Sequence, residues 1–132
     1  MSRENVEVVR QAYAALERRD ARGTLAALDP QIEWRTRENL PDAATHRGHE
    51  EVMRWFARWL ESWDDFKLET KDFTDAGEYV VVFTRQSGRG ADSGAYAEFD
   101  ETHVWKLRNG QATEVVEYRT KADALAALGL SE

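Results

Sequence analysis

The stretch ETHVWKLRNGQATEVVEYRT, residues 101–120, decides the fold because it predicts two strands joined by a tight turn at Asn109-Gly110. Both central residues of a type I′ turn need a positive φ, which Asn and Gly adopt most readily. A two-residue loop pairs Arg108 with Gln111, and that register predicts which side chains share a face of the sheet. The sequence therefore predicts an antiparallel hairpin with a defined inner and outer face.

One face of this hairpin is bulkier and more aromatic than the other, so we expect it to turn inward. Counting back from the turn, the register pairs Leu107 with Ala112, Trp105 with Glu114, His103 with Val116 and Glu101 with Tyr118. The opposite face then holds Thr102, Val104, Lys106, Arg108, Thr113, Val115, Glu117 and Arg119. An acid and an imidazole on the inward face predict a polar site within an aromatic interior.

Length, charge and composition restrict what the chain can be. The chain has 132 residues, of which 42% are hydrophobic. This length and composition predict a single globular domain over residues 1–132, with its own hydrophobic core. The net charge of -7 opposes binding to nucleic acid or to anionic membrane surfaces. The chain has no Cys, which excludes disulfides and thiolate chemistry. Since it shows neither a signal peptide nor an apolar run long enough to span a bilayer, we expect a cytoplasmic protein.

Apolar periodicity predicts the other elements. Helices are expected from Ser2 through Leu16, after the N-cap candidate Asp20 as far as Asp29-Pro30, from His49 to Trp63, and over residues 121–130 with a C-cap at Gly129. Strands are expected over residues 31–36, 66–74 and 78–87, in addition to the hairpin. This order predicts an α+β fold with its helices on one side of a largely antiparallel sheet.

Several short motifs follow one another in a characteristic order. They are VVRQAYAAL from residue 8, D-x-x-x-x-L-x-x-L-D-P from residue 20, IEW from residue 32, HRG from residue 46, GEYVVV from residue 77 and W-x-L-R-N-G from residue 105. In this order the chain resembles the SnoaL-like branch of the nuclear transport factor 2-like (NTF2-like) superfamily over nearly its whole length. The resemblance implies a cone in which a curved sheet wraps a long N-terminal helix and leaves a pocket, usually in a homodimer.

The same resemblance guides the choice of site residues. Relatives include polyketide cyclases and ketosteroid isomerases, and the general-base Asp of those isomerases corresponds here to Trp34. Their helix-one oxyanion Tyr falls nearer Ala12 than Tyr13. Many SnoaL-like sequences place a pocket Asp at the position of Thr120. His103 falls where the isomerases keep a protonated acid, so the resemblance and the hairpin register both place it in the pocket.

We therefore expect His103 to be a catalytic base that Glu101 orients, because a neighbouring carboxylate raises the pKa of an imidazole and selects its tautomer. The alternative is a structural histidine hydrogen-bonded to Tyr118. The residues expected to contact ligand are Tyr13, Trp34, Trp59, Trp105, Val116, Tyr118 and Thr120. The facing of Arg85 remains open, because YVVVFTRQ is apolar on both faces.

These features predict a small-molecule pocket protein that binds a compact apolar or aromatic ligand. Its chemistry would be cofactor-independent proton transfer, such as isomerisation or aldol-type cyclisation. No cofactor is expected, since there is no Gly-rich phosphate loop and no G-x-S-x-G elbow. No metal is expected either, because HRGHEE, which contains His46 and His49, does not match the HExxH pattern. The alternative is a non-catalytic binding or dimerisation module with a vestigial pocket.

A homodimer is expected through the outer face of the sheet. In the predicted register Val104 and Val115 lie side by side there, among Thr102, Thr113 and long charged side chains. That mixture suits a modest interface.

Overall fold

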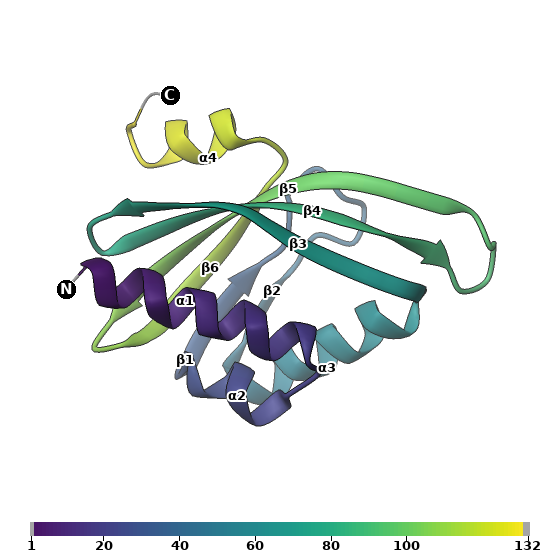
Figure 1. Ribbon diagram of the computed structural model, residues 1–132, viewed down its shortest axis with the longest axis horizontal. Coiled ribbons are helices and arrows are strands. Elements are labelled where there is room, and N and C mark those ends of the chain that lie inside the picture. The colour runs from purple at the N-terminus through teal and green to yellow at the C-terminus, as the bar shows by residue number, and fades with distance from the viewer. Residues whose placement is uncertain (1, 131–132) are drawn as a thin grey trace.

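The computed structural model describes residues 2–130 and forms a curved sheet with helices on both faces (Figure 1). Its helices are α1 (Ser2–Glu17), α2 (Ala21–Ala26), α3 (Gly48–Glu61) and α4 (Lys121–Ala127). Its strands are β1 (Leu28–Arg35), β2 (Thr45–Arg47), β3 (Trp63–Ala76), β4 (Tyr79–Gly90), β5 (Tyr96–Arg108) and β6 (Gln111–Tyr118). The predicted α+β class is confirmed.

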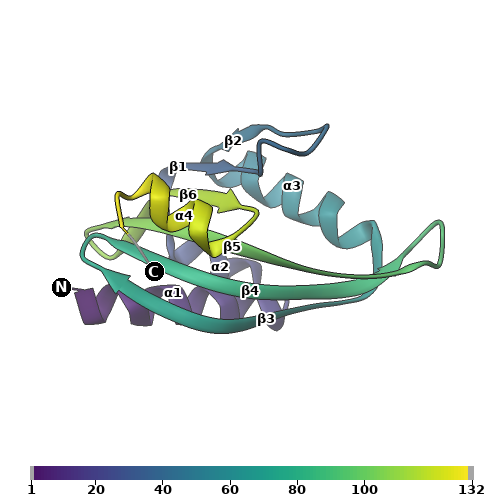
Figure 2. The ribbon, with the colours of Figure 1, turned by 90° about the horizontal axis from the view of Figure 1, so that it is seen from above.

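The six strands form one sheet in the order β2-β1-β6-β5-β4-β3. The pairing of β1 with β6 is parallel, and every other neighbouring pair is antiparallel. Helices α1, α2 and α3 cover the concave face, and α4 lies on the convex face, as Figures 1 and 2 show. The prediction that all helices share one side was therefore wrong for α4. Apolar side chains on both faces explain this, because Val81 and Val104 on the convex face pack against Ala124 and Leu125 of α4.

The main core lies between the concave face and the helices. Val9 and Tyr13 of α1 and Val52 and Phe56 of α3 pack there against the inner side chains of the sheet. Asp20 caps α2 as predicted, accepting a hydrogen bond from the Gly23 backbone N–H at 3.0 Å. The helices are thus fixed against the strands that carry the candidate polar residues.

The hairpin turn forms as predicted, but the register of β6 shifts just beyond it. Asn109 and Gly110 have φ values of 52° and 78°, and Arg108 pairs with Gln111. The next pairs are Leu107 with Ala112 and then Lys106 with Glu114, so the ladder skips Thr113. This β-bulge puts one extra residue into β6 and reverses the facing of everything after it.

The shifted register corrects the predicted faces of β6. His103 pairs with Glu117, not with Val116. Glu117 and Val115 are buried on the inner side, with 7% and no exposure, whereas Tyr118 packs in the convex-face cluster beneath α4. The predicted inward facing of Val116 and Tyr118 was wrong.

The same shift removes the surface patch that was to form a dimer. Val115 belongs to the inner core, and Val104 is 5% exposed because α4 covers it. Within residues 2–130, Val104 and Val115 therefore form no exposed pair on the convex face.

Several element boundaries also differ from expectation. β1 begins at Leu28, before Pro30, instead of at residue 31, and the short strand β2 forms inside the predicted loop. The glycine-rich segment after residue 87 extends β4 to Gly90, and the third helix ends two residues before Trp63, which opens β3. Among residues 2–130, no helix is both long and apolar enough to cross a membrane.

Candidate functional site

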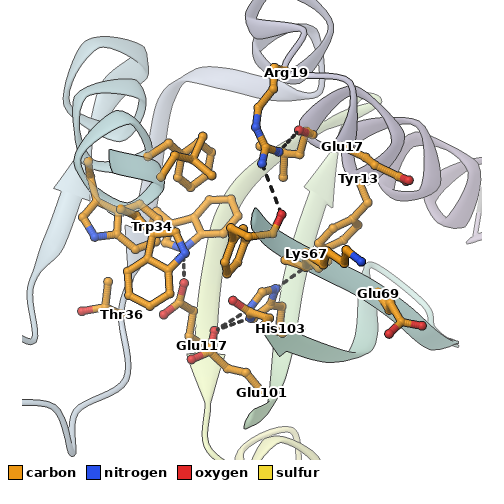
Figure 3. A pocket seen from close by; sticks show the side chains of 18 of the residues that line it. Tyr13, Glu17, Arg19, Trp34, Thr36, Lys67, Glu69, Glu101, His103 and Glu117 are labelled. Atoms are coloured by element: carbon orange, nitrogen blue, oxygen red, sulfur yellow. Dashed lines mark hydrogen bonds and ion pairs between the residues drawn. The ribbon is translucent and has the colours of Figure 1, made fainter. Parts of the chain in front are cut away.

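A cavity of about 280 Å³ lies between the concave face of the sheet and the helices α1 and α3 (Figure 3). Its size is near the lower end of the range usual for small-molecule sites. Its apolar and aromatic lining comprises Tyr13, Leu16, Trp34, Leu40, Trp55, Phe56, Trp59, Leu60, Phe66 and Leu68. Its polar and charged lining comprises Glu17, Arg19, Thr36, Asp42, Lys67, Glu69, Gln86, Glu101, His103 and Glu117. The cavity therefore combines mostly hydrophobic walls with ionisable groups.

His103 stands at the centre of a buried hydrogen-bond chain. Its Nδ1 lies 2.7 Å from the Tyr13 hydroxyl, and its Nε2 lies 2.7 Å from Oε1 of Glu101. Trp105 donates its indole N–H to the Tyr13 oxygen at 2.8 Å. An indole N–H can only donate, so with a neutral imidazole Tyr13 donates to Nδ1 and the proton on Nε2 is donated to Glu101. Both ring nitrogens of His103 are therefore occupied.

The Glu101 carboxyl has two further partners besides His103. Arg37, whose side chain is 15% exposed, places Nε 3.4 Å from Oε2 of Glu101. The Gln86 amide donates to Oε1 of the same carboxylate at 3.3 Å. Glu101 therefore lies between the Arg37 guanidinium and the His103 imidazole.

Glu117 is the second buried carboxyl of the site. It is 7% exposed, and its Oε2 accepts the Trp34 indole N–H at 2.9 Å. Among the described residues no hydrogen bond reaches its other oxygen, Oε1, although the residue lines the cavity (Figure 3). Glu117 thus offers the cavity a free carboxyl oxygen from deep within the fold.

Burial and neighbouring charge change the proton affinities of this group. Burial, followed by the charge of Glu101, raises the pKa of Glu117 from its ordinary 4.5 to about 7, although His103, the Trp34 hydrogen bond and Arg37 oppose that rise. Burial alone would lower the pKa of His103, but the hydrogen bond and charge of Glu101 and the charge of Glu117 outweigh it and raise that pKa. Glu117 therefore holds a proton that can be exchanged near neutral pH, and His103 binds its proton more tightly than an unperturbed imidazole does.

The structure brings together most of the predicted site residues. Tyr13, Trp34, Trp59, Glu101 and His103 all line the cavity. Trp105 lies one layer behind, where it donates to Tyr13.

Three predicted ligand contacts lie elsewhere in the molecule. Val116 follows the reversed facing of β6, Tyr118 packs under α4, and Thr120 caps α4 by accepting the Asp123 N–H at 3.0 Å. None of the three lines the cavity. The structural alternative for His103, a hydrogen bond to Tyr118, was also wrong, because its partner is Tyr13.

Sequence reasoning missed three members of the site, namely Glu117, Arg37 and Gln86. Glu117 was assigned to the outer face because nothing in the turn signals the bulge at Thr113. The alternation of β4 did contain Gln86 as a possible inward residue, since Val80, Val82, Thr84 and Gln86 share the concave side. Arg85 faces the other way and pairs with Asp100 at 2.8 Å. Arg37 lies in a loop, for which periodicity gives no facing.

The ligating atoms of Glu101, His103 and Glu117 all lie within 4.8 Å of one another, a spacing that a metal ion could bridge. The surrounding chemistry fits a dication poorly, because the Arg37 guanidinium is already beside Glu101 and would repel it. The other histidines lie apart from this cluster: His46 stacks on Trp55, and His49 bonds the Leu28 carbonyl at 2.8 Å. We therefore describe the cluster as a proton-sharing group.

The curved sheet that wraps α1 around an internal cavity is the NTF2-like cone. An NTF2-like protein from Burkholderia thailandensis is 30% identical, with 94% of this chain and 95% of that chain covered and a TM-score of 0.82. An NTF2-like protein of unknown function from Burkholderia pseudomallei is 28% identical, with 93% and 95% covered and a TM-score of 0.79. TerC, co-crystallised with polyporic acid, is 26% identical, with 96% and 97% covered and a TM-score of 0.79.

The family model for the SnoaL-like domain matches residues 9–115, so the chain belongs to the SnoaL-like domain family. No curated protein matches the chain.

Proposed function

We propose that the protein binds a compact, largely aromatic small molecule in its cavity and exchanges a proton with it through Glu117. The observation that carries this proposal is the buried Glu117 carboxyl, whose Oε1 has no hydrogen-bond partner among the described residues and whose pKa is about 7. A general acid or base works best when its pKa lies near the working pH. The similarity to TerC, which was co-crystallised with polyporic acid, supports a ligand-binding role for the cavity.

The roles within the cluster follow from which atoms are free. His103 has both ring nitrogens occupied, so it is poorly placed to take a proton from a ligand directly. Glu117 is free at Oε1 and is the better proton acceptor. His103 and Glu101 then hold compensating charge and a second proton beside it, which replaces the sequence-based assignment of His103 as the base. Isomerisation and aldol-type cyclisation both require such proton transfer at a carbon beside a carbonyl.

The second candidate function is a non-catalytic module. A ligand-binding protein requires an open cavity, whereas such a module does not. A vestigial pocket would be filled by Trp34, Trp59 and Trp105. Here Trp34 and Trp59 form walls around open space of about 280 Å³, and Trp105 lies behind Tyr13. This observation favours a ligand-binding role over a purely structural one.

Binding is tested with 2-acetonaphthone, a neutral aromatic ketone, by calorimetry, and with native mass spectrometry of the purified protein to detect a retained molecule. Leu68→Trp should fill the cavity and abolish binding, because Leu68 lines it from β3. Lys71→Trp adds the same ring at an exposed position of the same strand and should leave binding unchanged. Equal binding by both variants would place the ligand elsewhere and overturn the proposal.

Proton exchange is tested with the same ketone in deuterated water, by following the loss of its methyl proton signal. The protein should accelerate exchange, and Glu117→Gln should reduce that acceleration by about 100-fold or more, the contribution typical of a general base. Glu50→Gln, at an exposed position on α3, is the matched control. Binding without accelerated exchange would favour the non-catalytic module.

Homodimer formation stays a proposal that rests on the family resemblance, and its surface needs reassignment because the predicted valine patch is buried. Sedimentation at micromolar concentration tests it, and a single species of about 15 kDa would rule it out.

A further inference from the structure

Several hydrogen-bond donors around Glu117 and His103 are already committed to acceptors of the protein. Trp34 donates to Glu117, Trp105 donates to Tyr13, and the Gln86 amide nitrogen donates to Thr84 and Glu101. Glu117 lines the cavity, and its Oε1 receives no hydrogen bond from the described residues. A ligand that completes this arrangement must supply a donor to that oxygen.

The charges around the cavity favour a cationic donor over a neutral one. Its lining contains the five carboxyl residues Glu17, Asp42, Glu69, Glu101 and Glu117, against the two cations Arg19 and Lys67 and the imidazole of His103. Two of these acids have a cationic partner outside the lining, since Arg37 lies 3.4 Å from Glu101 and Lys71 lies 3.2 Å from Glu69. The net charge of the whole chain is also -7. Such a field attracts cations and repels anions.

The walls suit the rest of such a ligand. The rings of Trp34, Trp55 and Phe56 pack against one another along the cavity, and Trp59 of α3 and Tyr13 of α1 also line it. Aromatic rings attract an organic ammonium group through their quadrupole and bury the hydrocarbon attached to it. Recognition of an ammonium group needs two features, a carboxyl group and aromatic rings. Glu117 supplies the first in this cavity, and the rings along its walls supply the second.

We propose that the ligand of this cavity carries a protonated amine, which donates a hydrogen bond to Oε1 of Glu117 while its aromatic body lies among the tryptophans. The proposal rests on the proposed function, since it names the ligand class for the same cavity. A divalent metal would meet the same carboxyls, but the aromatic walls offer it no ligand atoms, and the positive charge of Arg37 repels a dication more strongly than an ammonium group.

Binding of an ammonium group requires an ionised Glu117, and this links affinity to pH. The groups that set its charge are Glu101 and His103 on β5, Arg37 after β1 and Tyr13 on α1, together with the Trp34 donor. Because the pKa of Glu117 is about 7, amine affinity should rise about tenfold per pH unit up to pH 7 and level off above it. At pH 7 binding should release about half a proton per ligand.

The experiment compares three probes of one shape, namely 2-naphthylmethylamine, 2-naphthalenemethanol and 2-naphthoate. Calorimetry between pH 6 and 8, in buffers of different ionisation enthalpy, measures affinity and proton release together. The amine should bind most tightly and the carboxylate least. Glu117→Gln should keep the Trp34 hydrogen bond, weaken the amine about 10- to 100-fold and remove its pH dependence, with the alcohol little changed. Glu50→Gln should leave all three affinities unchanged.

The other outcomes are decisive in different ways. Tighter binding of the alcohol or the carboxylate than of the amine would overturn the ammonium inference and leave the proposed pocket intact. Failure of all three naphthyl probes and of 2-acetonaphthone to bind the folded protein would count against the proposed function itself. Tight binding of Zn²⁺ or Mn²⁺ alone, lost in Glu117→Gln and in Glu101→Gln, would show that the acidic end serves a metal and would also overturn the inference.

Discussion

Two acid–base side-chain pairs lie on opposite faces of the same sheet, and they differ in surroundings more than in geometry. His103 and Glu101 meet at 2.7 Å with side chains that are 4% and 7% exposed. Arg85 and Asp100 meet at 2.8 Å with side chains that are 43% and 40% exposed. Similar distances therefore accompany very different dielectric environments. Water screens the outer pair, while the inner pair interacts strongly with every other charge near it.

This contrast explains why the inner cluster, unlike the outer pair, holds an exchangeable proton near pH 7. On the outer face the Arg85 hydrogen bond lowers the pKa of Asp100, and on the inner face burial raises the pKa of Glu117 to about 7. The first carboxyl is kept ionised and takes part in no proton exchange at neutral pH. The second is balanced between its two forms, as proton transfer requires.

The largest expected effect comes from removing the central acid of the inner cluster. Glu101→Leu leaves Arg37 without its counter-charge and His103 without its acceptor. Breaking a buried pair on one side costs about 3 to 5 kcal/mol, so the free energy of unfolding should fall by that amount. Urea denaturation at pH 7 measures it.

The matched change on the outer face is Asp100→Leu, which should cost less than about 1 kcal/mol. Equal losses for the two variants would break the contrast between the faces. A loss below about 1 kcal/mol for Glu101→Leu would show that Arg37 reaches water when its partner is gone.

The second prediction concerns pH. A carboxyl whose folded pKa is raised binds protons more tightly in the folded state, so its contribution to stability is full below its unfolded pKa and is lost as pH rises. For Glu117 the window runs from about 4.5 to about 7, and the raised pKa of His103 acts in the same direction above 6.5. Stability should fall by about 1 to 3 kcal/mol between pH 5 and 7.5.

Urea midpoints across this range test the prediction, and Glu117→Gln should flatten the slope. Asp100 predicts the opposite sign in another window, since its lowered pKa removes stability only as pH falls below about 3.8. A wild-type slope that Glu117→Gln leaves unchanged would assign the effect to another group.

The third prediction distinguishes a structural from a purely functional His103. His103→Leu leaves the Tyr13 hydroxyl without its acceptor and removes one of the donors to Glu101. Leaving such buried groups unpaired costs about 1 to 3 kcal/mol. Chemical denaturation of wild type and variant measures the loss, and His103→Gln, which keeps hydrogen-bonding atoms, is the control. Unchanged or increased stability would show that the chain from Trp105 to Glu101 contributes little to folding.

The sequence predicted those site residues whose facing is fixed by a nearby sequence motif, such as a turn. It did not predict those whose facing depends on the rest of the fold. His103 and Glu101 were placed correctly because the Asn109-Gly110 turn fixes β5 and no irregularity in β5 intervenes. Glu117 was misplaced because one extra residue in β6 reversed its face, and bulges depend on the twist of the whole sheet more than on local sequence. Arg37 could not be placed, since loop side chains follow tertiary contacts.

The first and last helices, α1 and α4, also show that the sequence predicts an element more readily than its place in the fold. The helix α1 and its inward Tyr13 followed from periodicity, because an apolar stripe must face the core. The helix α4 was also predicted, but not its face of the sheet. That choice depended on the convex-face cluster around Val81 and Val104, and the apolar positions on both faces of β4 gave no preference.

The smallest expected effect concerns the exposed pair of Arg85 and Asp100. It provides a reference against which the effects in the buried cluster can be compared. Arg85→Ala and Asp100→Ala, made singly and together, form a double-mutant cycle whose coupling energy isolates their interaction. Because both side chains are more than a third exposed, we expect a coupling of about 0.2 to 1 kcal/mol that shrinks further in high salt. Urea denaturation at low and high ionic strength measures it. A coupling above about 2 kcal/mol that is insensitive to salt would mean that the convex face is screened from water, for example by a second copy of the chain. That result would also give the proposed homodimer the surface that the sequence could not assign.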